Sequence, residues 1–290
     1  MADENSVTMS KDMLYGIVIA VLAGLLVLSI FTSGFGIVKP VATNNPPAQN
    51  NTVVTPPANN TGNPPSNGTA APPTIPTMTV KPGSIPPLGQ ASAPVSVVVI
   101  SDFQCPYCAR LYTDAETSIR TNYVQSGKVK VYFRYFPLSF HQFAMQAAVA
   151  AACANDQGKF WEMHDTLFQN QDTWSAASSV DSIFQSYAVS LGLNNATFST
   201  CYNAKTHTAE INADEVEAQN YGVRGTPASF IMIPKSKISQ TALQAAVDSQ
   251  NAVYGAGSLS VYQDSSTYSV LIPGAFPYSA FDAILSKVSY

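Results

Sequence analysis

The chain has 290 residues and a formal net charge of −4. It contains no cluster of lysine or arginine residues, which argues against a nucleic-acid-binding protein of the usual basic kind. Large apolar side chains are scarce between residues 32 and 94, so residues 95–290 are expected to hold the hydrophobic core.

The sequence begins with a short tail, residues 1–12, which is followed by an uncharged apolar run over residues 13–31. A run of this length can cross a bilayer as a helix. A cleaved signal peptide is the alternative, but acidic residues precede the run and no clear small-x-small cleavage site follows it. We therefore expect an uncleaved anchor that crosses the cell membrane once.

Residues 32–77 are rich in proline, asparagine, threonine and alanine. Such a segment cannot bury enough apolar surface to offset the entropy of ordering, so we expect a disordered tether that its prolines extend. Three Asn-x-Ser/Thr triplets, at Asn50, Asn59 and Asn67, are candidate glycosylation sites, although chance also produces them in this composition. Glycosylation would place the tether outside the cytoplasm. A fourth triplet, at Asn195, is better explained by a helix N-cap.

Two cysteines two residues apart, in Cys105-Pro106-Tyr107-Cys108, lie between a predicted strand (95–100) and a predicted helix (109–126). Free N–H groups and the macrodipole at a helix N-terminus favour a thiolate at the first cysteine. Pro106 suits the first turn because its missing N–H has no partner to lose there. Cys108 lies one turn further on, where it can attack a mixed disulfide on Cys105. The arrangement predicts dithiol–disulfide chemistry.

The rest of the chain alternates between sheet and helix patterns. A second strand, predicted over residues 129–136, follows the helix and implies a parallel strand pair. Further strands are predicted over 228–233 and 269–272, and a last helix over 278–288. Residues 234–268 form a longer connection than a hairpin needs, with a helix pattern at 241–249 and a strand pattern at 258–262.

This order of elements resembles the DsbA-like thiol:disulfide oxidoreductases of the thioredoxin superfamily, over residues 78–290. The resemblance is carried by four stretches, residues 102–108, 157–164, 222–227 and 272–275. It implies an α/β, thioredoxin-like fold with a helical insertion at about residues 138–220. The N-terminal transmembrane helix and the tether would precede that domain.

The resemblance also assigns roles to residues. It implies that Cys105 is an exposed nucleophile and that Cys108 is the buried resolving thiol. The residues implied to support them are Pro106, Tyr107, Thr226 and a cis-proline, Pro227. No metal and no other cofactor is expected.

Two features depart from the family pattern. The position six residues before the first cysteine usually holds a buried acid and is Val99 here, so proton transfer would need water or another group. Asp102 is nearer to the cysteines, but a residue directly after a strand is more often a solvated cap. The connection over residues 234–268 is the second departure, and is either an added substrate surface or a decoration.

Cys153 and Cys201 both lie in the helical insertion. We favour a structural disulfide between them, which would close a loop of about 50 residues and contribute about 2–4 kcal/mol. Two independent buried thiols, or a zinc site shared with Cys105 and Cys108, are the alternatives. Zinc ribbons normally show two close cysteine pairs, and this chain has one.

The three histidines are isolated in the sequence. His141 follows the second strand and is expected to be a polar residue at a helix start rather than part of the active site. His164 shares an apolar stripe with aromatic residues, which indicates a core or boundary position. His207 is expected to be solvated.

The predicted function is disulfide exchange with protein substrates on the extracytoplasmic side of the membrane, most simply as a dithiol oxidase with a monomeric catalytic domain. By resemblance, a quinone-linked membrane partner would reoxidise it. Tyr107 cannot carry the positive charge of a histidine, so we expect a less oxidising pair than in DsbA enzymes that have histidine at this position. A thioredoxin-like reductase and a non-catalytic binding or chaperone module are the alternatives. A peroxiredoxin-like peroxidase is disfavoured because Cys105 has a resolving cysteine.

Overall fold

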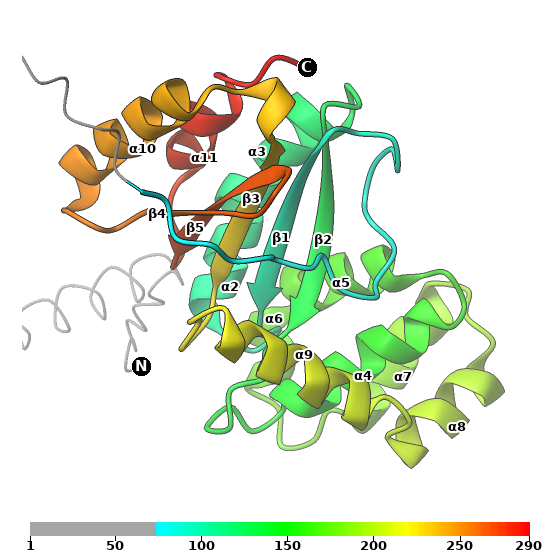
Figure 1. Ribbon diagram of the computed structural model, residues 1–290. Helices are drawn as coiled ribbons and strands as arrows, with labels where there is room; N and C mark the ends of the chain where they lie inside the picture. The colour runs from blue at the N-terminus through cyan, green and yellow to red at the C-terminus, as the bar shows by residue number, and fades with distance from the viewer. Residues whose placement is uncertain (1–73) are drawn as a thin grey trace, which may run out of the picture. The chain divides into compact units, whose positions relative to one another are not determined.

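The computed structural model describes residues 74–290 (Figure 1). The predicted tail, the anchor (13–31), most of the tether (32–77) and its three glycosylation triplets lie outside the described residues. Within residues 74–290, no helix is both long enough and apolar enough to span a membrane.

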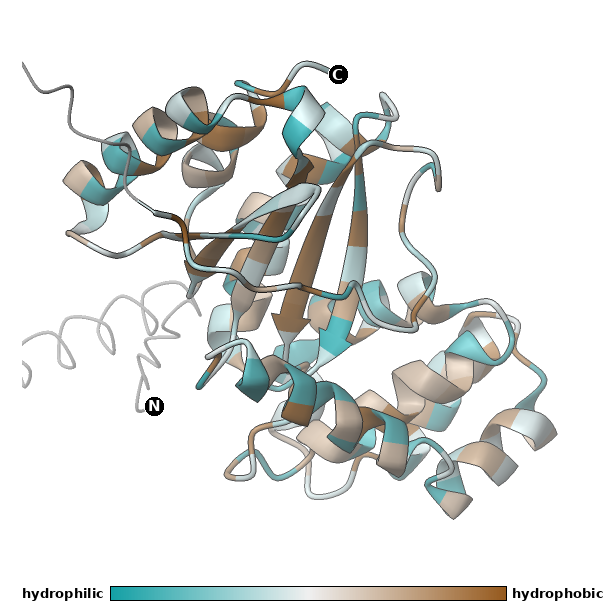
Figure 2. Ribbon diagram, viewed as in Figure 1, coloured by the Kyte–Doolittle hydropathy of each residue, from teal (hydrophilic) through white to brown (hydrophobic). Residues whose placement is uncertain are grey.

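A five-stranded sheet with the strand order β2-β1-β3-β5-β4 forms the centre of the described domain. Its strands are β1 (Val95–Ser101), β2 (Val129–Tyr135), β3 (Ala228–Pro234), β4 (Ser260–Gln263) and β5 (Thr267–Pro273). The predicted parallel pairing of β1 with β2 is confirmed, and the other strand pairs are antiparallel. The apolar run of β1, brown in Figure 2, follows from its interior place in the sheet, since Val97 and Val99 belong to one hydrophobic cluster and Val98 and Ile100 to another.

The helices before and after the insertion cover the sheet. After β1 the chain forms one extended helical stretch that alternates between α and π geometry, with segments α2 (Pro106–Leu111), η1 (Tyr112–Glu116), α3 (Thr117–Ile119) and η2 (Arg120–Val124). The later elements are the short η3 (Lys235–Lys237), α10 (Gln240–Tyr254) and α11 (Tyr278–Leu285). Val97 and Val99 of β1 share one hydrophobic cluster with Leu111, Leu243 and Phe281 from these helices.

The helical insertion consists of six helices between β2 and β3. They are α4 (Ala144–Asn155), α5 (Phe160–Gln169), α6 (Gln171–Ser175), α7 (Asp181–Ser190), α8 (Asn195–Ala204) and α9 (Thr208–Asn220). They lie beyond the ends of β1 and β2, at the edge where the cysteine motif follows β1 (Figure 1). Their core contains fully buried Trp174, Phe184 and Phe198, and it is continuous with Phe103 and Cys108 beside the motif. The insertion and the cysteine motif therefore share one packed interior.

The structure corrects two details of the sequence analysis and confirms a third. Asn194, not Asn195, is the N-cap of α8, and its side chain accepts a hydrogen bond from the Thr197 N–H at 3.0 Å. Residues before the expected domain boundary at 78 already pack on the fold, since Ile75 is buried and the Pro76 carbonyl accepts the Gln263 N–H at 3.0 Å. The helix and strand patterns predicted in the 234–268 connection are confirmed, since it contains the helix α10 and the strand β4, which lies at the edge of the sheet.

The sulfur atoms of Cys153 on α4 and Cys201 on α8 are bonded to each other, 48 residues apart in sequence. Replacing both cysteines with alanine should lower the free energy of unfolding by about 2–4 kcal/mol, because the unfolded chain regains the entropy of that loop. Urea denaturation followed by circular dichroism measures the difference. The matched control replaces Cys105 and Cys108, which close no long loop. Equal urea midpoints for the two double variants would contradict this prediction.

Candidate active site: a dithiol at the end of β1

The two cysteines of the motif face each other at the start of α2. Cys105 occupies the N-cap position, and its carbonyl accepts the N–H groups of Cys108 and Ala109 at 3.0 and 3.2 Å. Both cysteines are free thiols. Pro106 takes the first helical position, where proline costs no backbone hydrogen bond. The local sequence therefore places the first sulfur atom at the positive end of a helix.

Cys105 is not exposed, contrary to the expectation from sequence: only 4% of its surface is accessible. The turn before β3 covers it, because the Thr226 carbonyl oxygen lies 3.6 Å from the Cys105 sulfur. The peptide bond between Thr226 and Pro227 is cis. Antiparallel pairing of β1 with β3 brings this turn opposite the motif, although about 120 residues separate them in sequence.

The two thiols have opposite acidities. The hydrogen bond from the Cys108 side chain lowers the pKa of Cys105 from 9.0 to about 6, against the effect of burial, and the backbone of Cys108 contributes in the same direction. Burial raises the pKa of Cys108 well above its ordinary value, and the hydrogen bond and negative charge of Cys105 raise it further. At neutral pH the reduced site therefore holds one thiolate, on Cys105, and one buried thiol.

Asp102 is the nearest buried carboxyl group in sequence to the motif, and its position corrects the expectation of a solvated cap. Its Oδ1 accepts the Gln104 N–H at 2.7 Å, and its Oδ2 accepts the Leu138 N–H at 3.0 Å. The Nδ1 of His141 lies 2.6 Å from the same Oδ2. The Asp102 N–H points at the Cys108 sulfur, 3.5 Å away. His141 is therefore joined to the loop that carries the dithiol, which the sequence analysis had not favoured.

A buried glutamine from the insertion also holds this loop. The side-chain amide of Gln171, on α6, donates to the carbonyls of Phe103 at 2.6 Å and Cys105 at 3.0 Å. The Gln104 side chain accepts the Phe143 N–H at 2.6 Å. Sequence reasoning missed Gln171, because a polar residue in a short helix gives no local signal of a contact 66 residues away. These contacts tie the motif to the helical insertion.

The remaining predicted residues lie as follows. Tyr107 is 59% exposed, and the Arg110 guanidinium lies 5.3 Å from the centroid of its ring. Val99 is buried on β1, as the departure from the family pattern implied, and places no carboxyl group beside the thiols.

His164 is fully buried among aromatic rings, so its expected core position is confirmed. The described cysteines form two separate pairs rather than one zinc site.

A surface groove of about 350 Å³ lies on the cis-proline turn. It is lined by residues 222–228 together with Leu271, Pro273 and Gly274. The Thr226 hydroxyl is buried and makes no hydrogen bond within the described part of the chain. The groove thus offers an extended segment both space and polar backbone next to the Cys105 sulfur.

Comparison with known proteins places this site in a family. The sequence profile of the thioredoxin family matches residues 82–249, more than half of the chain. The chain belongs to this thioredoxin family. A probable disulfide bond formation protein D of Bacillus cereus is 28% identical over 149 residues, which cover 50% of this chain and 68% of that protein.

A Na⁺/H⁺ antiporter NhaA 3 of Salinispora tropica is 36% identical over 144 residues, or 49% of this chain. The match spans only 21% of the antiporter, about a fifth of its length. Among solved structures, a variant of Wolbachia pipientis alpha-DsbA1 with one residue substituted aligns with a TM-score of 0.52 and 21% identity, covering 70% of this chain and 89% of that one. This likeness shows that the described domain has the DsbA-type thioredoxin fold with its helical insertion.

Removing the hydrogen bond between the two sulfur atoms tests the acidity of the site. In a Cys108→Ala variant, the pKa of Cys105 should rise from about 6 toward 9.0, because the largest stabilisation of its thiolate is lost. The rate of alkylation by iodoacetamide, measured between pH 4 and about 10, reports this pKa through the thiolate fraction. A Ser101→Ala variant is the control, since that side chain acts on Cys108. An unchanged midpoint in Cys108→Ala would show that another group sets the pKa of Cys105.

Asp102 accepts hydrogen bonds from two backbone N–H groups and faces His141, so an amide cannot replace it. In an Asp102→Asn variant, the NH₂ group would face one of these donors, and we expect a loss of about 1–3 kcal/mol in the free energy of unfolding. Denaturant titration measures it. Asp172→Asn, an exposed change on α6, is the control. If both variants unfold at the same denaturant concentration, Asp102 does not organise this loop.

Proposed function

We propose that this chain is a thiol:disulfide oxidoreductase that exchanges disulfides with protein substrates through Cys105 and Cys108, and that it acts as a dithiol oxidase. The observation that carries the proposal is the pKa of about 6 at Cys105 beside a buried Cys108 thiol. A stabilised thiolate favours the reduced form of a pair, so the oxidised pair tends to pass its disulfide on.

In the oxidising direction, a substrate thiolate attacks the Cys105 sulfur of the oxidised pair. The bond between Cys105 and Cys108 breaks, and Cys108 leaves as a thiolate that takes up a proton. A second substrate thiolate then attacks the substrate sulfur of the mixed disulfide and expels Cys105. Two electrons pass from the substrate to the enzyme, and the low pKa of Cys105 makes it a good leaving group.

The surroundings of the dithiol support a protein substrate. The groove on the cis-proline turn could take an extended substrate segment as an added strand. Two large aromatic side chains near the dithiol are exposed to solvent. Tyr107, in the first turn of α2, is 59% exposed, and Phe140, next to His141, is 76% exposed. Such exposed rings are typical of binding surfaces for other proteins.

We also propose that the domain acts outside the cytoplasm, anchored through residues 13–31, as a monomer that a quinone-linked membrane partner reoxidises. The apolar run in the sequence and the disulfide between Cys153 and Cys201 support an oxidising compartment. Glycosylation at Asn50, Asn59 or Asn67 would be consistent with that location. The partner is inferred from resemblance to DsbA-like enzymes.

A redox titration of the full chain tests the direction of exchange. The chain is equilibrated in glutathione buffers, alkylated and weighed by mass spectrometry, with a Cys153→Ala/Cys201→Ala variant to isolate the active-site pair. We expect a reduction potential between about −120 and −180 mV, the range of disulfide donors. A value near about −270 mV, as in thioredoxin, would make the protein a reductase. A pair that never exchanges with glutathione would favour a non-catalytic binding module.

A further inference from the structure

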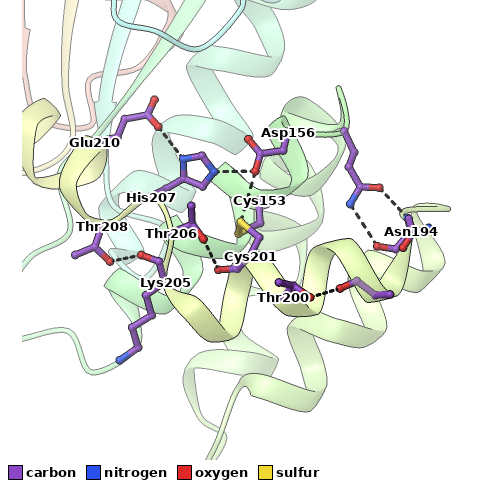
Figure 3. The surroundings of a disulfide bond; sticks show 12 residues. Cys153, Asp156, Asn194, Thr200, Cys201, Lys205, Thr206, His207, Thr208 and Glu210 are labelled. Atoms are coloured by element: carbon purple, nitrogen blue, oxygen red, sulfur yellow. Dashed lines mark hydrogen bonds and ion pairs between the residues drawn. A yellow bond between two sulfur atoms is a disulfide. The ribbon is translucent and has the colours of Figure 1, made fainter.

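The second sulfur pair lies beside a histidine and two carboxylates that the dithiol site does not use. His207, in the turn between α8 and α9, lies with its Nε2 2.9 Å from the Oδ2 of Asp156, at the end of α4 (Figure 3). The same Oδ2 is 3.5 Å from the Cys201 sulfur. The ligand atoms of Cys153, Cys201 and His207 all lie within 4.8 Å of one another. Three donor atoms therefore cluster, and an Asp156 carboxylate oxygen lies beside two of them, the His207 Nε2 and the Cys201 sulfur.

His207 is not solvated, which corrects the expectation from sequence. Its side chain is 17% exposed, and both ring nitrogens have carboxylate partners. Burial opposes protonation, but the hydrogen bonds with Asp156 and Glu210 outweigh it and raise the pKa of His207. The two carboxylates therefore fix the plane of the ring and direct its Nε2 at Asp156.

Residues around the site also fix the orientation of the His207 ring. The Glu210 Oε2 lies 2.9 Å from the His207 Nδ1, and the Ser84 hydroxyl donates to the other Glu210 oxygen at 2.5 Å. A carboxylate on one ring nitrogen is the usual way to orient a histidine that binds metal through the other. The Thr206 N–H and hydroxyl both donate to the Cys201 carbonyl, at 3.2 and 3.3 Å, and fix the turn. The imidazole is therefore placed before any ligand arrives.

Two thiolates, an imidazole nitrogen and a carboxylate oxygen form a donor set that zinc binds tetrahedrally. Its bond lengths, about 2.0–2.3 Å, put neighbouring donors about 3.3–3.8 Å apart. The Cys153 and Cys201 Cα atoms are 5.8 Å apart, so their sulfur atoms can reach that spacing by side-chain rotation alone. In the disulfide the sulfur atoms are bonded to each other and provide no thiolate. Only the reduced pair completes the set.

We propose that reduction of the Cys153–Cys201 disulfide creates a zinc site made by the two thiolates, the His207 Nε2 and the Asp156 carboxylate. A thiol reductant supplies two electrons and becomes a disulfide itself, the bond between Cys153 and Cys201 breaks, and zinc displaces the two thiol protons and binds the unprotonated Nε2. Either the disulfide or the metal then joins α4 to α8. The proposal does not depend on the function proposed for Cys105 and Cys108.

Cobalt substitution tests the site directly. The full chain with Cys105→Ser and Cys108→Ser is reduced with a phosphine, freed of it without air, and titrated with Co²⁺. We expect one equivalent to give thiolate-to-cobalt charge-transfer bands and tetrahedral d–d bands that Zn²⁺ then abolishes. The oxidised chain should give neither. Absence of charge-transfer bands in the reduced chain would overturn the proposal.

Variants in the same background assign the ligands. His207→Ala should weaken Zn²⁺ binding at least 10-fold, and Glu210→Gln about 10-fold through the orientation of the ring. Glu215→Gln, a change at a half-buried position further along α9, should leave the affinity unchanged. Equal affinity in His207→Ala and in Glu215→Gln would remove the histidine from the site and contradict the proposal.

A measurement on the unaltered chain covers the case in which a variant fails to fold. In a fixed thiol–disulfide buffer, the reduced fraction of Cys153 and Cys201 is measured by alkylation and peptide mass spectrometry, with Zn²⁺ or with a chelator. Zinc that binds only the reduced pair must increase that fraction. An identical fraction in both conditions would overturn the proposal.

Discussion

The hydrogen bond between the two sulfur atoms of Cys105 and Cys108 is the interaction on which the dithiol site depends. It has one donor and one acceptor, so it stabilises one thiolate and one thiol and disfavours any other charge state. Both cysteines are almost completely buried, where a second negative charge would be costly. The surrounding fold serves to place this pair at the start of α2 and to keep Cys108 out of water.

The helical insertion acts on the same pair through polar contacts. The Gln171 side-chain amide donates to the Phe103 and Cys105 carbonyls, and the Phe143 N–H donates to the Gln104 side chain. Two separate segments of the insertion therefore bind the loop that carries the dithiol. Asp102 adds a third attachment, to the chain after β2. A loop held at three points loses little further entropy when a substrate docks. The insertion therefore helps to position the dithiol.

The sequence was sufficient to predict those parts of the molecule that depend on local pattern. The strand before the motif, the helix after it and the parallel pair with β2 follow from residue periodicity and cysteine spacing within about 40 residues. The contact of Asp102 with His141 did not, because both are single polar residues and only the return of the chain after β2 brings them together. His207 was mispredicted for the same reason: its partners, Asp156 and Glu210, come from two different helices.

The two sulfur pairs differ in chemistry because their surroundings differ in charge. Cys105 lies at the positive end of a helix, with a buried thiol as donor, and a thiolate there is stable and ready to leave. Cys201 lies 3.5 Å from the Asp156 carboxylate. That carboxylate is paired with His207, whose ring also lies within 4.8 Å of both sulfur atoms. The surroundings of this pair therefore supply a carboxylate and an imidazole, which can serve as metal ligands, where Cys105 has a helix N-terminus and a thiol.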